Sequence, residues 1–211
     1  MTETVIVIDF ETTGLSPAKG ARATEVAAVR LIGDEIVDSF QSLMNAGTSI
    51  PPYIESLTGI TNAMVRSAPP APSVMRQLAA FINGAPLVAH NARFDQAFLE
   101  AELAPLRLSA GMRFACTMML AKRIYPRAPS YKLEALLEYA DVPHQDSFHR
   151  ALSDAMATAN LWLQMKRDLG ARIPIDALNH EVMNRIASQP DYWHRLSQHC
   201  KLERVPTRWM I

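Results

Sequence analysis

The stretch VIVIDFETTG, which begins at Val5, constrains the fold of this chain more than any other segment. Its apolar run, Val5 to Ile8, and the preceding Thr4 are rich in the β-branched residues typical of a strand buried on both faces. The run leads directly into Asp9 and Glu11, which are separated only by Phe10. Residues i and i+2 of an extended chain point to the same face, so the two carboxylates converge. They repel each other unless a divalent cation lies between them or water solvates both at a strand end.

Composition narrows the class of protein to which this strand belongs. With 211 residues, of which 49% are hydrophobic and 20% charged, the chain matches an ordinary globular domain. The 21 Lys and Arg balance 21 Asp and Glu, so a nucleic-acid partner would have to be attracted by local patches or bound metal. Cys116 and Cys200 have no zinc-site spacing and indicate reduced thiols. Without a leader pattern or a long apolar run, we expect a cytoplasmic protein with no membrane contact.

The order of the expected elements indicates an α/β fold. After the first strand, ATEVAAVRLI and EIVDSFQSLM flank Gly33-Asp34 and predict two strands joined by a tight turn, so three antiparallel strands come first. The segment APLVAH predicts a further short buried strand. Expected helices cover Val74 to Ile82, Ala92 to Leu103, TMMLAKRIY, LEALLEYA and RALSDAMATANLWLQMKRDLG. This pattern predicts a mixed sheet with helices packed on it.

Two further segments have less regular patterns. IPPYIESLTGITNAMVRSAPPAPS is rich in Pro, Ser and Thr, and indicates a surface excursion with short helical pieces, ending near Ser73. The plausible domain boundary lies between Gly170 and Pro174, which divides the chain into residues 1–170 and a C-terminal helical extension, 171–211. Ile175, Leu178, Val182 and Ile186 have near-helical spacing in that extension, and Pro190 interrupts it. We expect the extension to pack on the core, and the alternative is a docking surface for a second subunit.

Two other places combine acidic residues with strand or helix ends. In LVAHNARFDQAFL, Asp95 lies one turn into a helix that follows a strand, a position that the helix dipole also favours. In FHRALSDAMATANLW, His149 and Asp154 are five residues apart, about 140° around an ideal helix. They converge only if His149 lies in the loop before the first turn. Each of these residues alone has an ordinary structural explanation, as a cap or a surface group.

Taken together, the three segments resemble the DEDDh-type 3′–5′ exonucleases, the family that includes the proofreading subunit of bacterial DNA polymerase III and oligoribonuclease. VIDFETTGLSP matches the first motif with Asp9 and Glu11, and LVAHNARFDQAFL matches the second with Asp95. HRALSDA, as H-x4-D, matches the third with His149 and Asp154. LTGIT also resembles a short segment that often follows the third strand in the polymerase III-like branch. The resemblance covers Thr4 to Leu169, with all the catalytic positions present.

The resemblance implies a ribonuclease H-like fold with a mixed five-stranded sheet, and hydrolysis of phosphodiesters at the 3′ end of single-stranded DNA or RNA by a two-metal route. The cofactors would be two divalent cations, Mg²⁺ or Mn²⁺, because all the ligands are oxygen atoms. Asp9 would bridge them, Glu11 and Asp154 would complete the site on the nucleophile side, and Asp95 would hold the other ion through water. His149 would be the general base, since an imidazole accepts protons near neutral pH. A DNA polymerase or another replication or repair subunit is a possible protein partner.

Candidate substrate contacts follow from the same resemblance. They are the residues after the first motif, Phe10, Thr12, Thr13, Gly14 and Leu15, together with Asn91 and Phe94 near the end of the later strand. KRIYPRAPSYK adds Lys122, Arg123, Arg127 and Lys132 with Tyr125 and Tyr131 interleaved, a pattern that fits either a phosphate-tracking patch with stacking rings or a solvated turn.

Two alternative functions remain. One is a non-catalytic nucleic-acid or protein-binding module on an exonuclease fold, against which the intact set of mutually repelling carboxylates argues. The other is a zinc hydrolase, which the absence of an H-x3-H pair among the six histidines disfavours.

Overall fold

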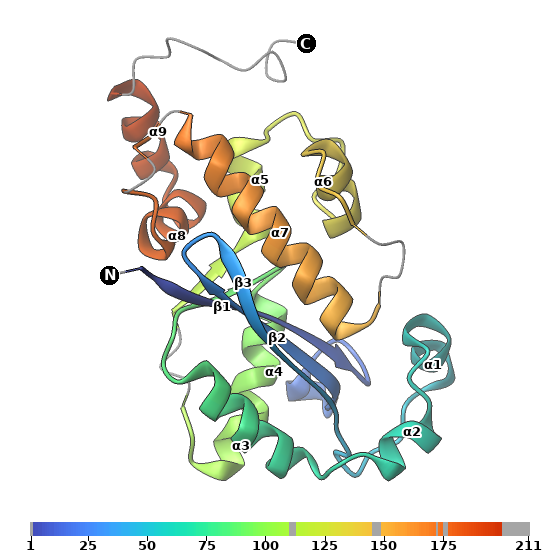
Figure 1. The fold of residues 1–211 in the computed structure, drawn as a ribbon. Coiled ribbons are helices and arrows are strands. Elements are labelled where there is room, and N and C mark those ends of the chain that lie inside the picture. The colour runs from blue at the N-terminus through green and yellow to red at the C-terminus, as the bar shows by residue number, and fades with distance from the viewer. Residues whose placement is uncertain (1, 110–112, 145–148, 172, 175–176, 200–211) are drawn as a thin grey trace.

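The computed structural model describes residues 2–109, 113–144, 149–171, 173–174 and 177–199 of the chain (Figure 1). A five-stranded sheet with the order β3-β2-β1-β4-β5 forms its centre. The strands are β1 (Thr4–Thr12), β2 (Ala23–Ile32), β3 (Glu35–Leu43), β4 (Leu87–Ala89) and β5 (Phe114–Cys116). β1, β2 and β3 pair antiparallel, whereas β4 lies parallel to β1 and β5 parallel to β4. The expected α/β fold with a mixed sheet is therefore confirmed.

The first strand is longer than its apolar run predicts, and this matters for the site. β2 pairs with β1 along its whole length, with Glu11 opposite Glu25 and Thr12 opposite Ala23, so the two acidic residues lie inside the strand. β4 is much shorter and pairs only with Ile6 and Val7. The last part of β1 therefore has a neighbouring strand on one side only, and its other side is open to side chains from elsewhere. β5 could not be predicted from the sequence, because a strand of three residues is too short to show an alternation of apolar and polar side chains.

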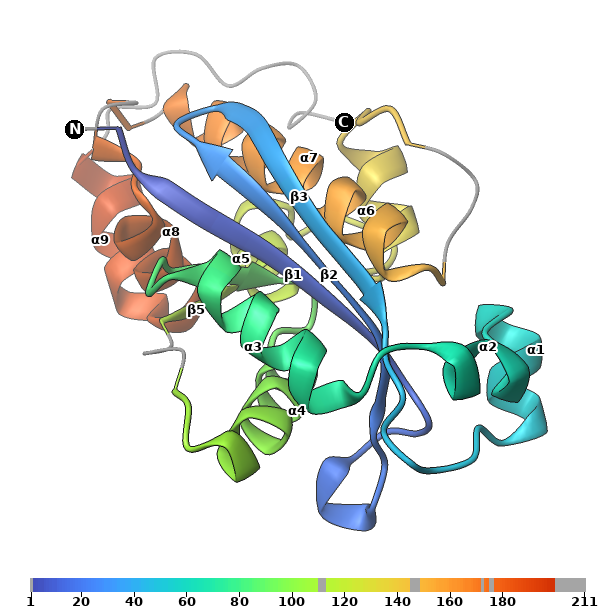
Figure 2. The same ribbon diagram turned by 60° about the horizontal axis from the view of Figure 1, so that its bottom comes forward.

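Helices cover both faces of the sheet (Figure 2). The side chains of Ile6, Ile8 and Phe10 belong to a core cluster shared with α3 (Ala71–Ile82) and α4 (Arg93–Leu103). Val5 and Val7 point the other way, into a cluster shared with the remaining helices of the main body: α5 (Thr117–Ile124), α6 (Leu133–Tyr139), α7 (Ala151–Gly170) and α8 (His180–Ser188). By the same alternation, the odd-numbered acidic residues of β1 face α7 rather than α4.

The Pro-rich excursion contains two short helices, α1 (Pro52–Thr58) and α2 (Asn62–Ser67). They form an arm beyond the end of β3, with a small cluster of their own made of Ile50, Ile54, Ile60 and Val65 (Figure 1). α3 begins at Ala71, earlier than the expected Val74, because proline is tolerated in the first turn of a helix. Two single turns of 3-10 helix complete this half of the chain, η1 (Pro17–Lys19) and η2 (Ala104–Leu106).

The C-terminal extension contributes α8 and α9 (Pro190–His199). α8 packs against α5 and β5. Its first residue, His180, is buried, its backbone N–H donates to Glu3 Oε2 at 2.8 Å, and its Nε2 donates to the carbonyl of Leu87 at 2.8 Å. Ile175 and Cys200 lie outside the described residues. Over the ranges that the structure describes, none of the helices combines the length and the apolarity that a membrane span requires.

Candidate active site

A pocket of about 710 Å³ opens where β1 and β4 end and α7 begins. Its lining joins residues that are far apart in the chain: Asp9, His90, Asn91, Met118, Ser130, Tyr131, Lys132, Leu133, Glu134, His149 and Asp154. Parallel strands present their carboxyl ends at one edge of a sheet, which is the usual place for a ligand in folds of this class. The first and third sequence motifs therefore meet at the wall of one pocket.

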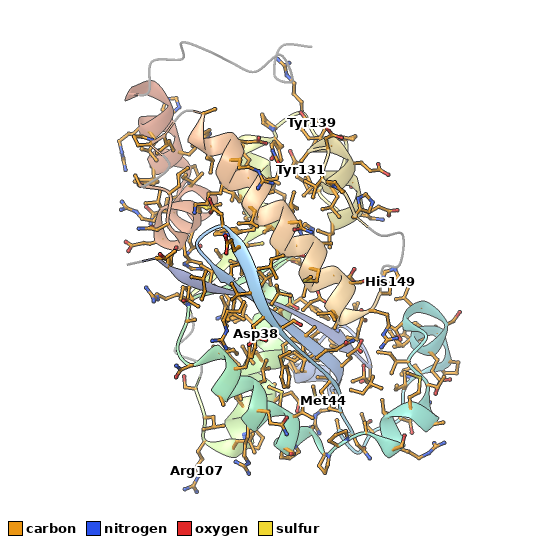
Figure 3. All side chains as sticks on the ribbon, viewed as in Figure 1. Asp38, Met44, Arg107, Tyr131, Tyr139 and His149 are labelled. Carbon is orange, nitrogen blue, oxygen red and sulfur yellow. The ribbon has the colours of Figure 1, made fainter. Side chains whose placement is uncertain are left out.

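Glu11, His149 and Asp154 approach one another closely in this region. One carboxylate oxygen of each acid and one ring nitrogen of His149 all lie within 4.8 Å of one another. His149 lies two residues before the first residue of α7, in the loop position on which convergence with Asp154 depends. Its backbone N–H donates to Asp154 Oδ2 at 3.1 Å, and its side chain is exposed, so the ring can meet a ligand (Figure 3).

Asp95 reaches β1 from the first turn of α4. Its Oδ1 accepts a hydrogen bond of 3.2 Å from the backbone N–H of Phe10. That N–H lies beyond the point where β4 stops pairing, so the carboxylate replaces a neighbouring strand. Asp95 itself is only 2% exposed, which places a buried acid beside Asp9 and Glu11.

The pKa values of all four acids, Asp9, Glu11, Asp95 and Asp154, are raised. Burial, followed by the charges of Asp154 and Glu25, raises the pKa of Glu11 to about 8, and only Arg150 opposes this shift. Burial also raises the pKa of Asp9 well above its usual range, and the neighbouring carboxylates, Asp95 first, add to the effect. The pKa values of Asp95 and Asp154 are raised as well, again chiefly by burial. Among the described residues, Arg150 opposes the shift of Glu11 and His149 opposes that of Asp154, so the negative charge of this cluster is compensated only in part.

The cluster fits a divalent cation. Asp154 Oδ1 is buried and has no hydrogen-bond partner among the residues that the structure describes, an arrangement that costs free energy unless something else binds that oxygen. All the converging donors except His149 are carboxylates, which suit Mg²⁺ or Mn²⁺ better than softer metals. Asp9, Glu11, Asp95 and Asp154 are therefore the residues that could hold such an ion.

The site also contains a pair that sequence reasoning missed. Glu25, on β2, is 1% exposed. The guanidinium of Arg150, the residue just before α7, donates two hydrogen bonds to its carboxylate and forms an ion pair with it. The signal in the sequence is a single acidic residue inside the mostly apolar strand ATEVAAVRLI, because a buried carboxylate needs a partner. Its partner could not be identified from the sequence, since Arg150 lies 125 residues away.

The candidate substrate residues after the first motif differ in what they can offer. The ring of Phe10 is buried in the core, so only its backbone can face a ligand. Thr12 and Thr13 are also buried. The Thr12 hydroxyl donates to the carbonyl of Gly14, and the Thr13 hydroxyl accepts from the backbone N–H of Arg22. Leu15, in contrast, is 87% exposed. The apolar side chain of Leu15 is therefore the one most available to a bound molecule.

The second wall of the pocket comes from Ser130 to Glu134, and a half-buried histidine holds it. His90 Nε2 lies 3.0 Å from the carbonyl of Tyr131, which can only accept, so Nε2 carries the proton; Nδ1 accepts from Thr117 Oγ1 at 2.9 Å. Burial lowers the pKa of His90 to about 4, so the ring is neutral. Of the two residues expected near the end of β4, Asn91 is exposed and lines the pocket, whereas Phe94 packs against Phe98.

The expected basic and aromatic patch is only partly available. Tyr125 is 2% exposed and its hydroxyl donates to Asp168 Oδ2 at 2.6 Å, so the interpretation of this ring as a stacking platform is wrong. Tyr131 and Lys132 do line the pocket, and the ammonium of Lys122 lies 5.7 Å from the centre of the Tyr131 ring. Tyr125, which directly follows α5, is part of the core, so its ring is not available for stacking.

Comparison with known proteins identifies relatives of this arrangement. The chain is 37% identical over 183 residues to a DNA polymerase III PolC-type protein of Caldanaerobacter subterraneus subsp. tengcongensis (85% of this chain, 13% of the relative). It is 38% identical over 169 residues to the 3′-5′ exonuclease DinG of Bacillus subtilis (78% of this chain, 18% of the relative). The chain thus spans less than a fifth of the length of these two relatives.

A solved structure and a family model agree with these relatives. Exonuclease X, solved in complex with 5′ overhanging duplex DNA, superposes with a TM-score of 0.69 at 28% identity, over 87% of this chain and 99% of that one. The family model described as RNase_T, exonuclease, matches residues 6–162, which include all three motifs. The chain therefore belongs to the RNase_T family of exonucleases.

Proposed function

We propose that this protein is a metal-dependent 3′–5′ exonuclease that removes nucleoside 5′-monophosphates from the 3′ end of a single strand. The observation that carries the proposal is the cluster of four acids with raised pKa values beside His149, in which the buried Asp154 Oδ1 has no hydrogen-bond partner within the described part of the chain. A domain kept only for binding gains nothing from carboxylates that destabilise one another.

The cofactors would be two divalent cations, Mg²⁺ or Mn²⁺. Asp9, Glu11, Asp95 and Asp154 would hold them, and Glu11 and Asp154 are the acids that lie beside His149. When bound, such ions lower the pKa of a coordinated water and stabilise the charge that develops on the leaving oxygen. The apolar part of β1 provides a rigid support for these ligands.

The residues of this chain would then perform the acid–base and positioning steps. His149 takes a proton from the attacking water, whose oxygen forms a bond to the phosphorus of the terminal phosphodiester. The bond from phosphorus to the 3′-oxygen of the penultimate nucleotide breaks, that oxygen takes a proton from solvent water, and His149 returns its proton to solvent. The products are a nucleoside 5′-monophosphate and a strand shortened by one residue that ends in a 3′-hydroxyl. Leu15, Asn91 and the backbone from Phe10 to Gly14 would hold the terminal nucleotide.

The substrate is DNA or RNA with an unpaired 3′ end. The pocket volume, about 710 Å³, leaves room for more than one nucleotide and Lys132 on its wall can meet a phosphate, but none of its lining residues identifies a contact to a 2′-hydroxyl. Relatives named as DNA polymerase III proteins point to replication or repair, with a polymerase or another replication subunit as partner. We propose a cytoplasmic location with the rest of that machinery.

The domain plan is part of the same proposal. Residues 1–170 would form the exonuclease domain, which agrees with the family match over 6–162, and residues 171–211 an extension that stabilises it. The hydrogen bonds of His180 to Glu3 and to the carbonyl of Leu87 support a stabilising role, because they join α8 to the start of β1 and to β4.

The test is digestion of matched single-stranded and duplex DNA and RNA, labelled at the 5′ end, with products sized over time. We expect stepwise shortening from the 3′ end with Mg²⁺ or Mn²⁺, none with chelator, and slower digestion of blunt duplex. Cutting of a circular single strand would indicate an endonuclease instead. Tight binding of the strand without any shortening would favour the second candidate, a binding module on an exonuclease fold.

A further inference from the structure

The buried Glu25 holds the start of α7 from the neighbouring strand. It lies opposite Glu11 in the antiparallel register of β1 and β2, and is 1% exposed. Arg150 Nη2 donates to its Oε1 at 2.9 Å and Arg150 Nε donates to its Oε2 at 3.1 Å. Two parallel hydrogen bonds from a planar guanidinium fix orientation as well as distance. The pair therefore fixes the position of the residue that directly follows His149.

Two more donors complete the coordination of Glu25. Gln41 Nε2 donates to Oε1 at 2.9 Å, and the backbone N–H of Ala151 donates to Oε2 at 3.2 Å. Ala151 is the first residue of α7, and the side chain of the preceding Arg150 does not cap the helix. Glu25 thus caps α7 from a different element. With four donors on its two oxygens, it has little capacity left for a metal ion, in contrast to Glu11 and Asp154.

His149 itself has an unusual backbone conformation. Its φ angle is +68°, in the left-handed region that costs a residue with a side chain free energy. Such a conformation persists only where the surroundings impose it. Here the hydrogen bond from the His149 N–H to Asp154 Oδ2 holds the residue itself. The hydrogen bonds of Glu25 with Arg150 and Ala151 hold the two residues that follow it.

We propose that Glu25 and Arg150 are a positioning pair for His149: they touch no substrate, and they maintain the left-handed conformation that places the imidazole beside Glu11 and Asp154. The inference rests on the proposed function, in which His149 is the general base. It assigns the pair a part in the rate of the reaction that is separate from the stability it gives to the fold.

The kinetic test uses Arg150→Gln and Glu25→Gln, with the 5′-labelled single strand and Mg²⁺. We expect each variant to lower kcat by about 10- to 100-fold, because a displacement of about 1 Å in a reacting group has that effect, with KM changed less than about threefold. In a His149→Ala background, Arg150→Gln should change the remaining rate by less than about threefold. Arg150→Lys, which keeps the charge without the fork, should lie between the wild type and Arg150→Gln and covers the case in which that variant does not fold.

The control is Arg30→Gln, which changes an arginine of β2. Its guanidinium lies 4.4 Å from the centre of the Phe81 ring and donates to the Phe81 carbonyl at 2.8 Å, away from the pocket. It should lower the melting temperature and leave kcat unchanged. A wild-type kcat in Arg150→Gln and Arg150→Lys, or an equal loss with and without His149, would overturn the positioning role.

Amide hydrogen exchange provides a readout that needs no activity. The N–H of His149 should exchange about tenfold faster or more in Arg150→Gln than in the wild type, and at the wild-type rate in Arg30→Gln. Unchanged exchange at His149 in Arg150→Gln would contradict the inference. If the wild-type protein shows no nuclease activity, the proposed function fails, whereas the exchange rates still decide whether the pair holds His149.

Discussion

Two regions of this molecule bury acidic side chains in opposite ways. Glu102, on α4, receives a bidentate ion pair from Arg22 at 2.8 and 2.9 Å, and the backbone N–H of Ala23 donates to it at 3.2 Å. Glu25 has the same arrangement with Arg150 and Ala151: an arginine fork followed by the N–H of the next residue. At the end of β1, in contrast, Asp9 and Glu11 form no ion pair with an arginine within the described part of the chain, and their pKa values are raised.

The difference separates structural acids from functional ones. A carboxylate that ties two elements together is stable because its charge and its lone pairs are satisfied within the fold. The acids of β1 lie beside one another, and Asp9 lines the pocket, so their mutual repulsion reduces stability. Under the proposed function, this loss of stability is the cost of a site that binds divalent cations.

The largest effect is expected from neutralising the cluster. Asp9→Asn or Asp154→Asn should lower turnover by about 10⁴-fold or more, since each removes a ligand of the cations that stabilise the developing charge. In chelator, both variants should melt at a higher temperature than the wild type, because repulsion between carboxylates is relieved. Rates of product release and melting curves measure the two effects, and near wild-type turnover in both variants would refute the site.

The next largest effect concerns the general base. His149→Ala should lower kcat by about 10²- to 10⁴-fold, the usual contribution of a positioned base. The affinity for Mn²⁺ should change little, because the carboxylates remain. Kinetics and calorimetric titration with Mn²⁺ separate the two outcomes. A variant with the full rate, or one that loses activity only through loss of metal, would return His149 to a structural role.

Breaking a structural pair should have the reverse profile. Arg22→Ala leaves the buried Glu102 without its fork, which should reduce the free energy of unfolding by about 1–3 kcal/mol, a moderate figure because the Arg22 side chain is 40% exposed. Chemical denaturation measures this loss. Turnover should fall far less than in the cluster variants, by less than about tenfold. A loss of activity as large as that of Asp9→Asn would contradict the division between the two kinds of acid.

A further effect is the pH dependence of the metal-free protein. The pKa of Glu11 is raised from 4.5 to about 8, so its contribution to stability is fully present below pH 4.5 and is lost as the pH rises through 8. Burial lowers the pKa of His90 to about 4, so its contribution is present above pH 6.5 and is lost as the pH falls towards 4. Melting temperatures in chelator should therefore decline on both sides, and Glu11→Gln should remove part of the alkaline decline while leaving the acid one.

Removing the C-terminal extension tests the domain plan. Truncation after Gly170 exposes the surface against which Met183 and Ile186 are buried, and breaks both hydrogen bonds of His180. We expect an insoluble protein or one with a melting temperature lower by many degrees. A soluble truncation with full activity would favour a separate docking role for the extension. The comparison of solubility and rate with the full chain decides between them.

Local patterns made much of this arrangement predictable, whereas contacts across the fold did not. Alternation placed Asp9 and Glu11 on one face of a strand, and the spacing of HRALSDA required His149 to precede its helix, as it does. The position at which β1 ends could not be predicted, because its pairing with β2, and not the apolar run, determines how far the strand continues. The partners of Glu25 and His90 are 125 and 41 residues away, and only the folded chain brings them together.

The central claim is that the acids of β1 bind a divalent cation, because the described side chains do not neutralise them. Calorimetric titration of the metal-free protein with Mn²⁺, followed by melting of the same samples, tests it. We predict binding that raises the melting temperature in the wild type and is lost or greatly weakened in Asp9→Asn, while Arg30→Gln binds like the wild type. Wild-type protein that binds no Mn²⁺ and melts at the same temperature with and without it would contradict the account.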